Sequence, residues 1–242
     1  MTDSHNYPSS ANIHRETLPN GITVLVYERP GAQSVVIEGY LRAGALAETP
    51  EQGGLANFTA VSLMRGSQQV SFDEIYERLE SVGAELGFSS GYHLTSFSAQ
   101  SLAEDADLVL HLLADVVRQP AFPEPLLNQL KGQIITGLQM RANDTQHMAS
   151  EAFRQLIYPN HPYGRSQNGT LQTVPGLTTA DVQRFHTDFY GPRGMVICLV
   201  GALTPAQAVA KVSQVLGDWG KPNQQAMPVL PELVLPDGRL HH

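Results

Sequence analysis

The sequence has one cysteine, few basic residues and no long apolar run, and each scarcity excludes a class of protein. A lone Cys198 cannot form an internal disulfide or a cysteine-based zinc knuckle, and its place in the apolar run MVICLV predicts a buried, inert thiol. With 15 Lys and Arg against 23 Asp and Glu, the formal charge of -8 disfavours nucleic acid and anionic membranes as partners. No apolar stretch approaches the ~20 residues of a membrane-spanning helix, so we expect a soluble protein.

The amino-acid composition, including the placement of prolines, divides the 242 residues into three parts. Residues 1–12 are polar and are expected to form a mobile tail. They show no basic cluster followed by an apolar stretch, the pattern of an export signal, so we expect a cytoplasmic protein. Residues 13–221 are expected to form the folded domain, because 42% hydrophobic residues suffice for a full core. Residues 222–242 contain four prolines and are expected to be a linker toward a second domain.

Apolar periodicity predicts an α+β fold. Alternating or continuous apolar runs predict strands at residues 13–18, 22–28, 34–42, 84–90, 92–100 and 195–200. A period near 3.6 predicts helices at residues 55–64, 71–83, 104–118, 123–140, 145–157, 179–189 and 204–216. Because the strands are grouped, with long helical blocks between them, we expect a mixed, largely antiparallel sheet with helices packed on one face.

Three segments carry recognisable motifs. The first is LPNGITVLVYERPGAQSVVIEGYLRAGALAETPEQGGLANF, the second is LQMRANDTQHMASEAFRQLIYPNHPYGRSQNGT, and the third is FYGPRGMVICLVGAL. Together they resemble the insulinase, pitrilysin and mitochondrial processing peptidase family of zinc peptidases over residues 14–220. The resemblance is to the first of the two homologous halves usual in that family. It implies either that a second half has been cut away, which we favour, or that this is a single-domain member.

The same resemblance implies that the zinc site has been lost. Active members carry His-x-x-Glu-His on the helix after Gly-Gly-Leu, where two imidazoles four residues apart share one zinc and the Glu takes a proton from bound water. The matching positions here are Asn57 for the first His, Ala60 for the base and Val61 for the second His. The third ligand, a later Glu, matches Gly137 or its neighbours, and residues 131–141 contain no carboxylate. We therefore expect no zinc, no other cofactor and no catalytic residue.

The histidines offer no replacement site. No two of the nine are three or four residues apart, the spacing that aligns metal ligands on a helix. His161, in the segment NHPYG, is expected to be a structural turn residue rather than a ligand.

The resemblance also implies a peptide-binding strand. Active members add the peptide as a strand to a sheet edge, which uses backbone hydrogen bonds and tolerates side-chain change. The matching edge here consists of Glu85, Leu86, Gly87, Phe88, Ser89 and Ser90. Gly87 replaces the family's usual Asn, and a plain structural strand is the alternative interpretation.

The leading hypothesis is a non-catalytic subunit that pairs with an active zinc peptidase and completes its peptide-binding chamber. The expected partners are a subunit with an intact His-x-x-Glu-His motif and a peptide substrate. Two alternatives remain open at this stage: an active metallopeptidase whose ligands lie outside the motif, and a stand-alone peptide-binding or scaffold module.

Overall fold

The structure is a computed structural model that describes residues 7–233 of the chain. Within that range the strands form one six-stranded sheet with the order β1-β2-β6-β3-β5-β4. Neighbouring strands are antiparallel except β2 and β6, which run parallel. The mixed, largely antiparallel sheet expected from the sequence is confirmed. The strands are β1 (His14–Thr17), β2 (Thr23–Glu28), β3 (Ser34–Leu41), β4 (Glu85–Ser90), β5 (Thr95–Leu102) and β6 (Val196–Gly201).

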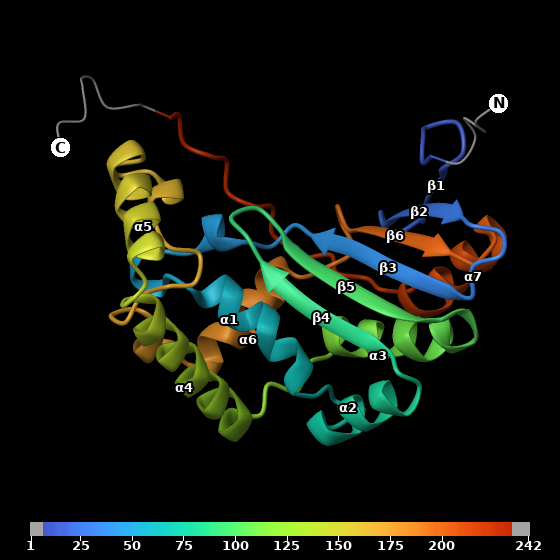
Figure 1. The fold of residues 1–242 in the computed structure, drawn as a ribbon, viewed down its shortest axis with the longest axis horizontal. Coiled ribbons are helices and arrows are strands. Elements are labelled where there is room, and N and C mark those ends of the chain that lie inside the picture. The colour runs from blue at the N-terminus through green and yellow to red at the C-terminus, as the bar shows by residue number, and fades with distance from the viewer. Residues whose placement is uncertain (1–6, 234–242) are drawn as a thin grey trace.

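Apart from α5, the described helices lie to one side of the sheet, as expected (Figure 1). α1 packs against α6 and the edge strand β4, while α3 packs against β5 and α7. α5 stands at the end of the molecule away from β1 (Figure 1). The helices are α1 (Leu55–Ser62), α2 (Phe72–Ser81), α3 (Ala106–Arg118), α4 (Glu124–Arg141), α5 (Thr145–Ile157), α6 (Thr179–Phe189) and α7 (Pro205–Leu216).

The core lies between the sheet and these helices. β5 alternates strictly between buried and exposed residues, so one face of the strand meets the helices and the other is open. On β3, Val35, Ile37 and Leu41 are fully buried on the helix side. Burial of each such side chain contributes about 1.5–3 kcal/mol, so this layer holds the sheet and helices together.

Local sequence signals place the helix ends well. The capping box of Ser71 and Glu74 is present at the start of α2, and Thr204 caps α7 in the same way. The helix expected at 55–64 is shorter, because α1 ends at Ser62 and continues as a 3-10 turn, Leu63–Arg65. Gly66 then ends the turn with a φ of +119°, a backbone angle that side chains disfavour.

The prediction of a buried Cys198 is wrong. Its neighbours Ile197 and Leu199 face the core, so the pleat turns Cys198 to the open face of the sheet, where it is half-buried beside Leu25 and Glu38. Burial, together with the Glu38 carboxylate, raises the pKa of the thiol, which keeps it protonated at neutral pH.

No helix within residues 7–233 is both long enough and apolar enough to cross a membrane.

Two strand glycines differ in what surrounds them, and this generates the first prediction. A Cβ at Gly39 on β3 would overlap the Val196 carbonyl oxygen and the Phe97 ring, whereas a Cβ at Gly87 on β4 would meet no atom within 4 Å. Gly39→Ala should lower the free energy of unfolding by about 1–3 kcal/mol, because it overpacks the sheet. Urea denaturation measures the free energy of unfolding of both variants.

Gly87→Ala is the matched control, and its free energy of unfolding should stay within about 0.5 kcal/mol of the wild-type value. Equal stability of the two variants would contradict the packing around Gly39.

Candidate functional site

α1 begins at a tight turn held by a buried carboxylate. Gly54, just before the helix, has a φ of +94°, and a Cβ there would collide with the backbone of residues 168–169. The Glu48 side chain accepts hydrogen bonds from the backbone N–H of Gly54 (3.1 Å) and of Ala56 (2.7 Å). These groups belong to the first turn of the helix, which has no intrahelical acceptors. Glu48 therefore caps α1 from seven residues before the helix starts.

The environment of Glu48 perturbs its titration. Burial raises the pKa of the carboxyl from 4.5 to about 7, although the N–H donors of Ala56 and Gly54 and the Arg165 guanidinium oppose the shift. Arg165 also donates a hydrogen bond to the backbone carbonyl of Glu48 (3.1 Å). The Glu48 carboxyl group is thus occupied by its hydrogen bonds to the start of α1.

The expected zinc-ligand positions lie on two helices, α1 and α4, that contact each other. Asn57 and Val61 are four residues apart on α1 and both are half-exposed, whereas Ala60 is completely buried. α4 lies against α1, and a Cβ at Gly137 would meet no atom within 4 Å.

The donor set at these positions does not fit a zinc ion. An amide, two aliphatic side chains and a glycine replace the imidazoles and carboxylates that bind zinc in proteins. Across residues 7–233 no three His, Cys, Asp or Glu side chains are grouped closely enough to hold a metal ion.

β4 is an edge strand with a free row of backbone groups. It pairs only with β5 within the described sheet. Gly91 donates its N–H to the Leu94 carbonyl (2.8 Å), and antiparallel pairs alternate, so Leu86, Phe88 and Ser90 direct their N–H and C=O groups away from β5. α1 packs directly beside this strand. A peptide added along β4 would therefore lie beside α1.

The side chains of β4 divide between two environments. Leu86 and Phe88 pack against the core on the helix side. Glu85, Gly87 and Ser89 pair with exposed β5 residues on the open side of the sheet. The expected peptide-binding residues thus form one strand, in which backbone groups rather than side chains point to the free edge.

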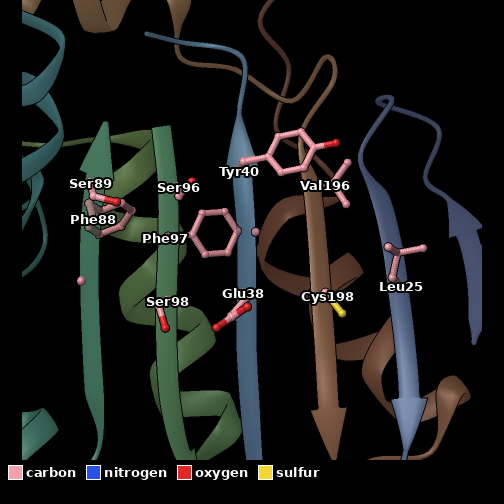
Figure 2. A pocket seen from close by; sticks show the side chains of 12 residues that line it. Leu25, Glu38, Tyr40, Phe88, Ser89, Ser96, Phe97, Ser98, Val196 and Cys198 are labelled. Atoms are coloured by element: carbon pink, nitrogen blue, oxygen red, sulfur yellow. The ribbon is translucent and has the colours of Figure 1, made fainter. Parts of the chain in front are cut away.

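The open face of the sheet is hollowed next to β4. A depression of about 660 Å³ runs across the middle strands. Tyr40, Val196, Leu25 and Cys198 give it an apolar floor, with Glu38 as the charged side chain among them (Figure 2). The remaining lining residues are Gly39, Gly87, Phe88, Ser89, Ser96, Phe97 and Ser98. The hollow suits a chain of mainly apolar or neutral groups.

The NHPYG segment is structural, as expected for His161. The buried imidazole accepts a hydrogen bond at Nδ1 from the Tyr163 N–H (3.1 Å) and lies 3.3 Å through Nε2 from the Pro231 carbonyl oxygen. The ring nitrogens are therefore used within the chain rather than presented to a metal. His161 also ties the C-terminal segment, which has no helix or strand at residues 222–233, to this end of the molecule.

Sequence reasoning missed an aromatic group beside the β4–β5 hairpin. Tyr92 donates its hydroxyl toward the carbonyls of Tyr163 (2.9 Å) and Arg165 (2.8 Å), and His93 Nε2 lies 2.6 Å from the Tyr163 hydroxyl. These contacts fasten the hairpin that carries β4 to the segment after α5. The residues are about 70 positions apart, so no local pattern could have linked them.

The α+β fold and the Gly-Gly-Leu entry to α1 point to a peptidase-type domain. The sequence model of the insulinase family, peptidase family M16, matches residues 23–171, and a model described as the peptidase M16 inactive domain matches residues 176–240. The first match covers more than half of the 242 residues, so the chain belongs to peptidase family M16.

Known relatives agree with this assignment. An uncharacterized zinc protease of Mycobacterium leprae is 26% identical over 208 residues, which is 86% of this chain and 47% of that protein. A probable mitochondrial-processing peptidase subunit beta of Arabidopsis thaliana is 26% identical over 212 residues, or 87% of this chain and 40% of that protein. The crystal structure of a peptidase M16 inactive domain from Pseudomonas fluorescens superposes with a TM-score of 0.84 at 25% identity and covers 92% of this chain and 54% of the other. The chain thus spans about half the length of these relatives.

The raised pKa of Glu48 generates the second prediction. The unfolded chain loses this proton near pH 4.5, whereas the folded protein keeps it to about pH 7. Between these values the folded state binds more protons, so raising the pH lowers the free energy of unfolding by about 1.4 kcal/mol per pH unit through this group. Glu48→Gln should remove that contribution. Urea denaturation of both proteins from pH 4.5 to 7.5 measures the difference in slope.

The matched control is Glu77→Gln, at an exposed position on α2, which should keep the wild-type pH profile. Parallel profiles for the wild type and Glu48→Gln would show that burial does not hold the proton on Glu48.

Proposed function

We propose that this chain is a non-catalytic M16 subunit that pairs with an active zinc peptidase and completes its peptide-binding chamber. The proposal rests mainly on the side chains that α1 and α4 carry at the positions where zinc ligands are expected. α1, which carries Asn57, Ala60 and Val61, packs beside a free sheet edge, and neither these residues nor Gly137 on α4 supplies an imidazole or a carboxylate.

The side chains at the expected ligand and base positions support the proposal that the chain alone does not hydrolyse peptides. A catalytic zinc site needs about three protein ligands and an open position for water. Ala60 stands where the general base is expected, and its methyl group can neither take nor deliver a proton. Without these groups the chain has no means to activate a water molecule at this place, and zinc is not part of the proposed function.

The sheet edge and the open face support retained peptide binding. The outward backbone groups of Leu86, Phe88 and Ser90 can accept an added strand. The hollow on the open face adjoins β4 through Gly87 and Ser89, so the two surfaces are continuous. An extended peptide on β4 would have one side of its chain toward α1 and the other toward the open face. A surface that contacts the peptide in this way can form one wall of a peptide-binding chamber.

The relatives support pairing. The Arabidopsis relative is named as one subunit of a processing peptidase, and the matched relatives are about twice as long as this chain. We therefore propose a partner that carries an intact His-x-x-Glu-His motif and supplies the metal, while this chain supplies an additional peptide-binding surface.

The zinc content of the purified chain tests the loss of the metal site. We expect well below about 0.1 zinc per chain by elemental mass spectrometry, because the site lacks the required ligands. The double variant Asn57→His/Val61→His places two imidazoles on one face of α1 and should bind zinc at least about tenfold more tightly than either single variant. Isothermal titration with zinc chloride measures the affinities.

The single variants Asn57→His and Val61→His are the controls for nonspecific binding by surface histidines. One tightly held zinc per wild-type chain, with peptide cleavage abolished by a chelator, would instead establish an active peptidase with displaced ligands.

The role of the β4 edge is tested in the complex with a zinc-bearing family member. Ser90→Pro removes an outward N–H that is not bonded to β5, so strand addition should weaken while the fold is retained. In cleavage assays with a fluorogenic peptide, we expect KM to rise by about tenfold, a loss equivalent to one or two backbone hydrogen bonds, with kcat little changed. Thermal unfolding of the variant checks the fold.

Gln214→Ala, at an exposed position on α7 away from β4, is the control and should leave KM unchanged. If Ser90→Pro leaves KM at the wild-type value, peptide does not add to this edge. If no complex with a zinc-bearing subunit forms, the binding-module alternative gains support over pairing.

A further inference from the structure

Two arginines share a small pocket at one end of the sheet. Arg42 directly follows β3, and Arg193 lies in the loop before β6. The pocket has a volume of about 370 Å³, and its other lining residues are Gly194 and residues 224–227. Among the residues that the structure describes, no aspartate or glutamate lines it. We call it the Arg42–Arg193 pocket.

A buried glutamine fixes the position of Arg193. Gln224 is 5% exposed. Its Oε1 accepts the backbone N–H of Arg193 (3.0 Å), and its Nε2 donates to the carbonyls of Phe189 (3.3 Å) and Arg193 (3.2 Å). The backbone carbonyl of Gln224 accepts a hydrogen bond from the Arg193 guanidinium, which has further N–H donors. Those donors are therefore held in place before any ligand binds, which lowers the entropic cost of binding.

The Arg42 side chain lies over the loop that carries Arg193. A Cβ at Gly194 would come within 2.8 Å of Arg42 Cδ and Nε, so the glycine leaves the space that the arginine side chain occupies. Within residues 7–233 the ion pairs include neither arginine, and the Arg42 guanidinium has no hydrogen-bond partner. Both guanidinium groups thus lack a carboxylate partner in the described part of the chain.

Two like charges in one pocket favour the binding of an anion. Each guanidinium raises the electrostatic free energy of the other, and a bound anion removes that cost. The chain has 23 acidic residues against 15 basic ones, so the absence of a carboxylate from the pocket is not due to a shortage of acidic side chains. The planar N–H fork of arginine matches the oxygens of a carboxylate or a phosphate.

The hollow on the open face leads to this pocket. Tyr40 pairs with Val196 across β3 and β6, and both line the hollow (Figure 2). Arg42 and Gly194 stand two residues beyond this pair, at the same end of the two strands. Glu38 lies on the other side of Tyr40 along β3 and repels an anionic group from the rest of the hollow. A ligand that fills both places therefore joins apolar or neutral groups to one anionic group.

We infer that the Arg42–Arg193 pocket binds a carboxylate of a peptide whose neighbouring apolar residues occupy the hollow. The carboxylate is either the C-terminus of the peptide or the side chain of an aspartate or glutamate. Inorganic phosphate matches the arginines equally well but has no part that would contact an apolar floor. The preference for an acidic peptide rests on the peptide binding proposed above, but not on pairing with a zinc peptidase.

Fluorescence anisotropy with four labelled peptides tests the inference. All have the same acetylated core of leucine, alanine and serine, and they end in a neutral amide, a free carboxylate, an amidated aspartate or an amidated lysine. At least one of the two carboxylate peptides should bind the chain about fivefold more tightly than the neutral peptide, because its charge is paired at a partly exposed site. The tighter of the two identifies the source of the carboxylate. The lysine peptide should bind most weakly.

Substitution of Arg42 should change the preference without changing the binding of the peptide core. Arg42→Gln should abolish the preference and leave the dissociation constant of the neutral peptide unchanged. Arg42→Glu should reverse it, so that the lysine peptide binds more tightly than the carboxylate peptides. Arg78→Gln is the matched control, because it removes the same charge from an exposed position on α2, and it should keep the wild-type preference. Circular dichroism checks that the variants are folded.

Equal dissociation constants of the wild type for the neutral and both carboxylate peptides would overturn the carboxylate site, while peptide binding itself would stand. A preference that survives Arg42→Gln would also overturn it. Titration with inorganic phosphate is the remaining measurement: phosphate binding that Arg42→Gln abolishes, without any preference among the peptides, would assign the pocket to a free anion instead. If the chain binds none of the peptides, both the carboxylate site and peptide binding by this chain are wrong.

Discussion

The Glu48 carboxyl group at the start of α1 makes the contacts on which the arrangement of the site depends. It joins the loop after β3 to the first turn of the helix through two backbone N–H groups. The same corner is closed by Arg165, which bonds the Glu48 carbonyl, and by Thr173, which donates its hydroxyl to the Gly53 carbonyl (2.8 Å). Segments more than 100 residues apart are thereby fixed at one end of α1. The helix is positioned beside β4 by polar contacts at its start and apolar packing along its length.

Local patterns were enough to predict most of the fold. The capping box at Ser71 and the apolar period that follows it identify α2, because both signals lie within a few residues of each other. The α+β class follows from the grouping of strands and helices, and the structure and the related folds confirm it. Strand ends shifted by a few residues, as between the expected strand at 92–100 and β5 at Thr95–Leu102, because a two-residue hairpin turn occupies the difference.

The parts of the site that could not be predicted depend on long-range contacts. Gly-Gly-Leu located α1, but neither the cap from Glu48 nor the contact of His161 with Pro231 follows a short-range pattern. Cys198 was assigned to the core because its whole strand is apolar. A strand in the middle of a sheet with one open face alternates between two environments even when all its side chains are apolar. α5 shows the same limit: its period predicts a helix and an apolar face, but not the direction in which that face points.

Ala60 is completely enclosed, and this limits which side chains could replace its methyl group. A glutamate at this position would have to force its longer side chain into a close-packed region before any ligand existed to use it. Histidines at positions 57 and 61 face fewer steric obstacles, yet alone they provide no base. A zinc site built on α1 would therefore need a glutamate side chain for which the present packing around Ala60 leaves no room.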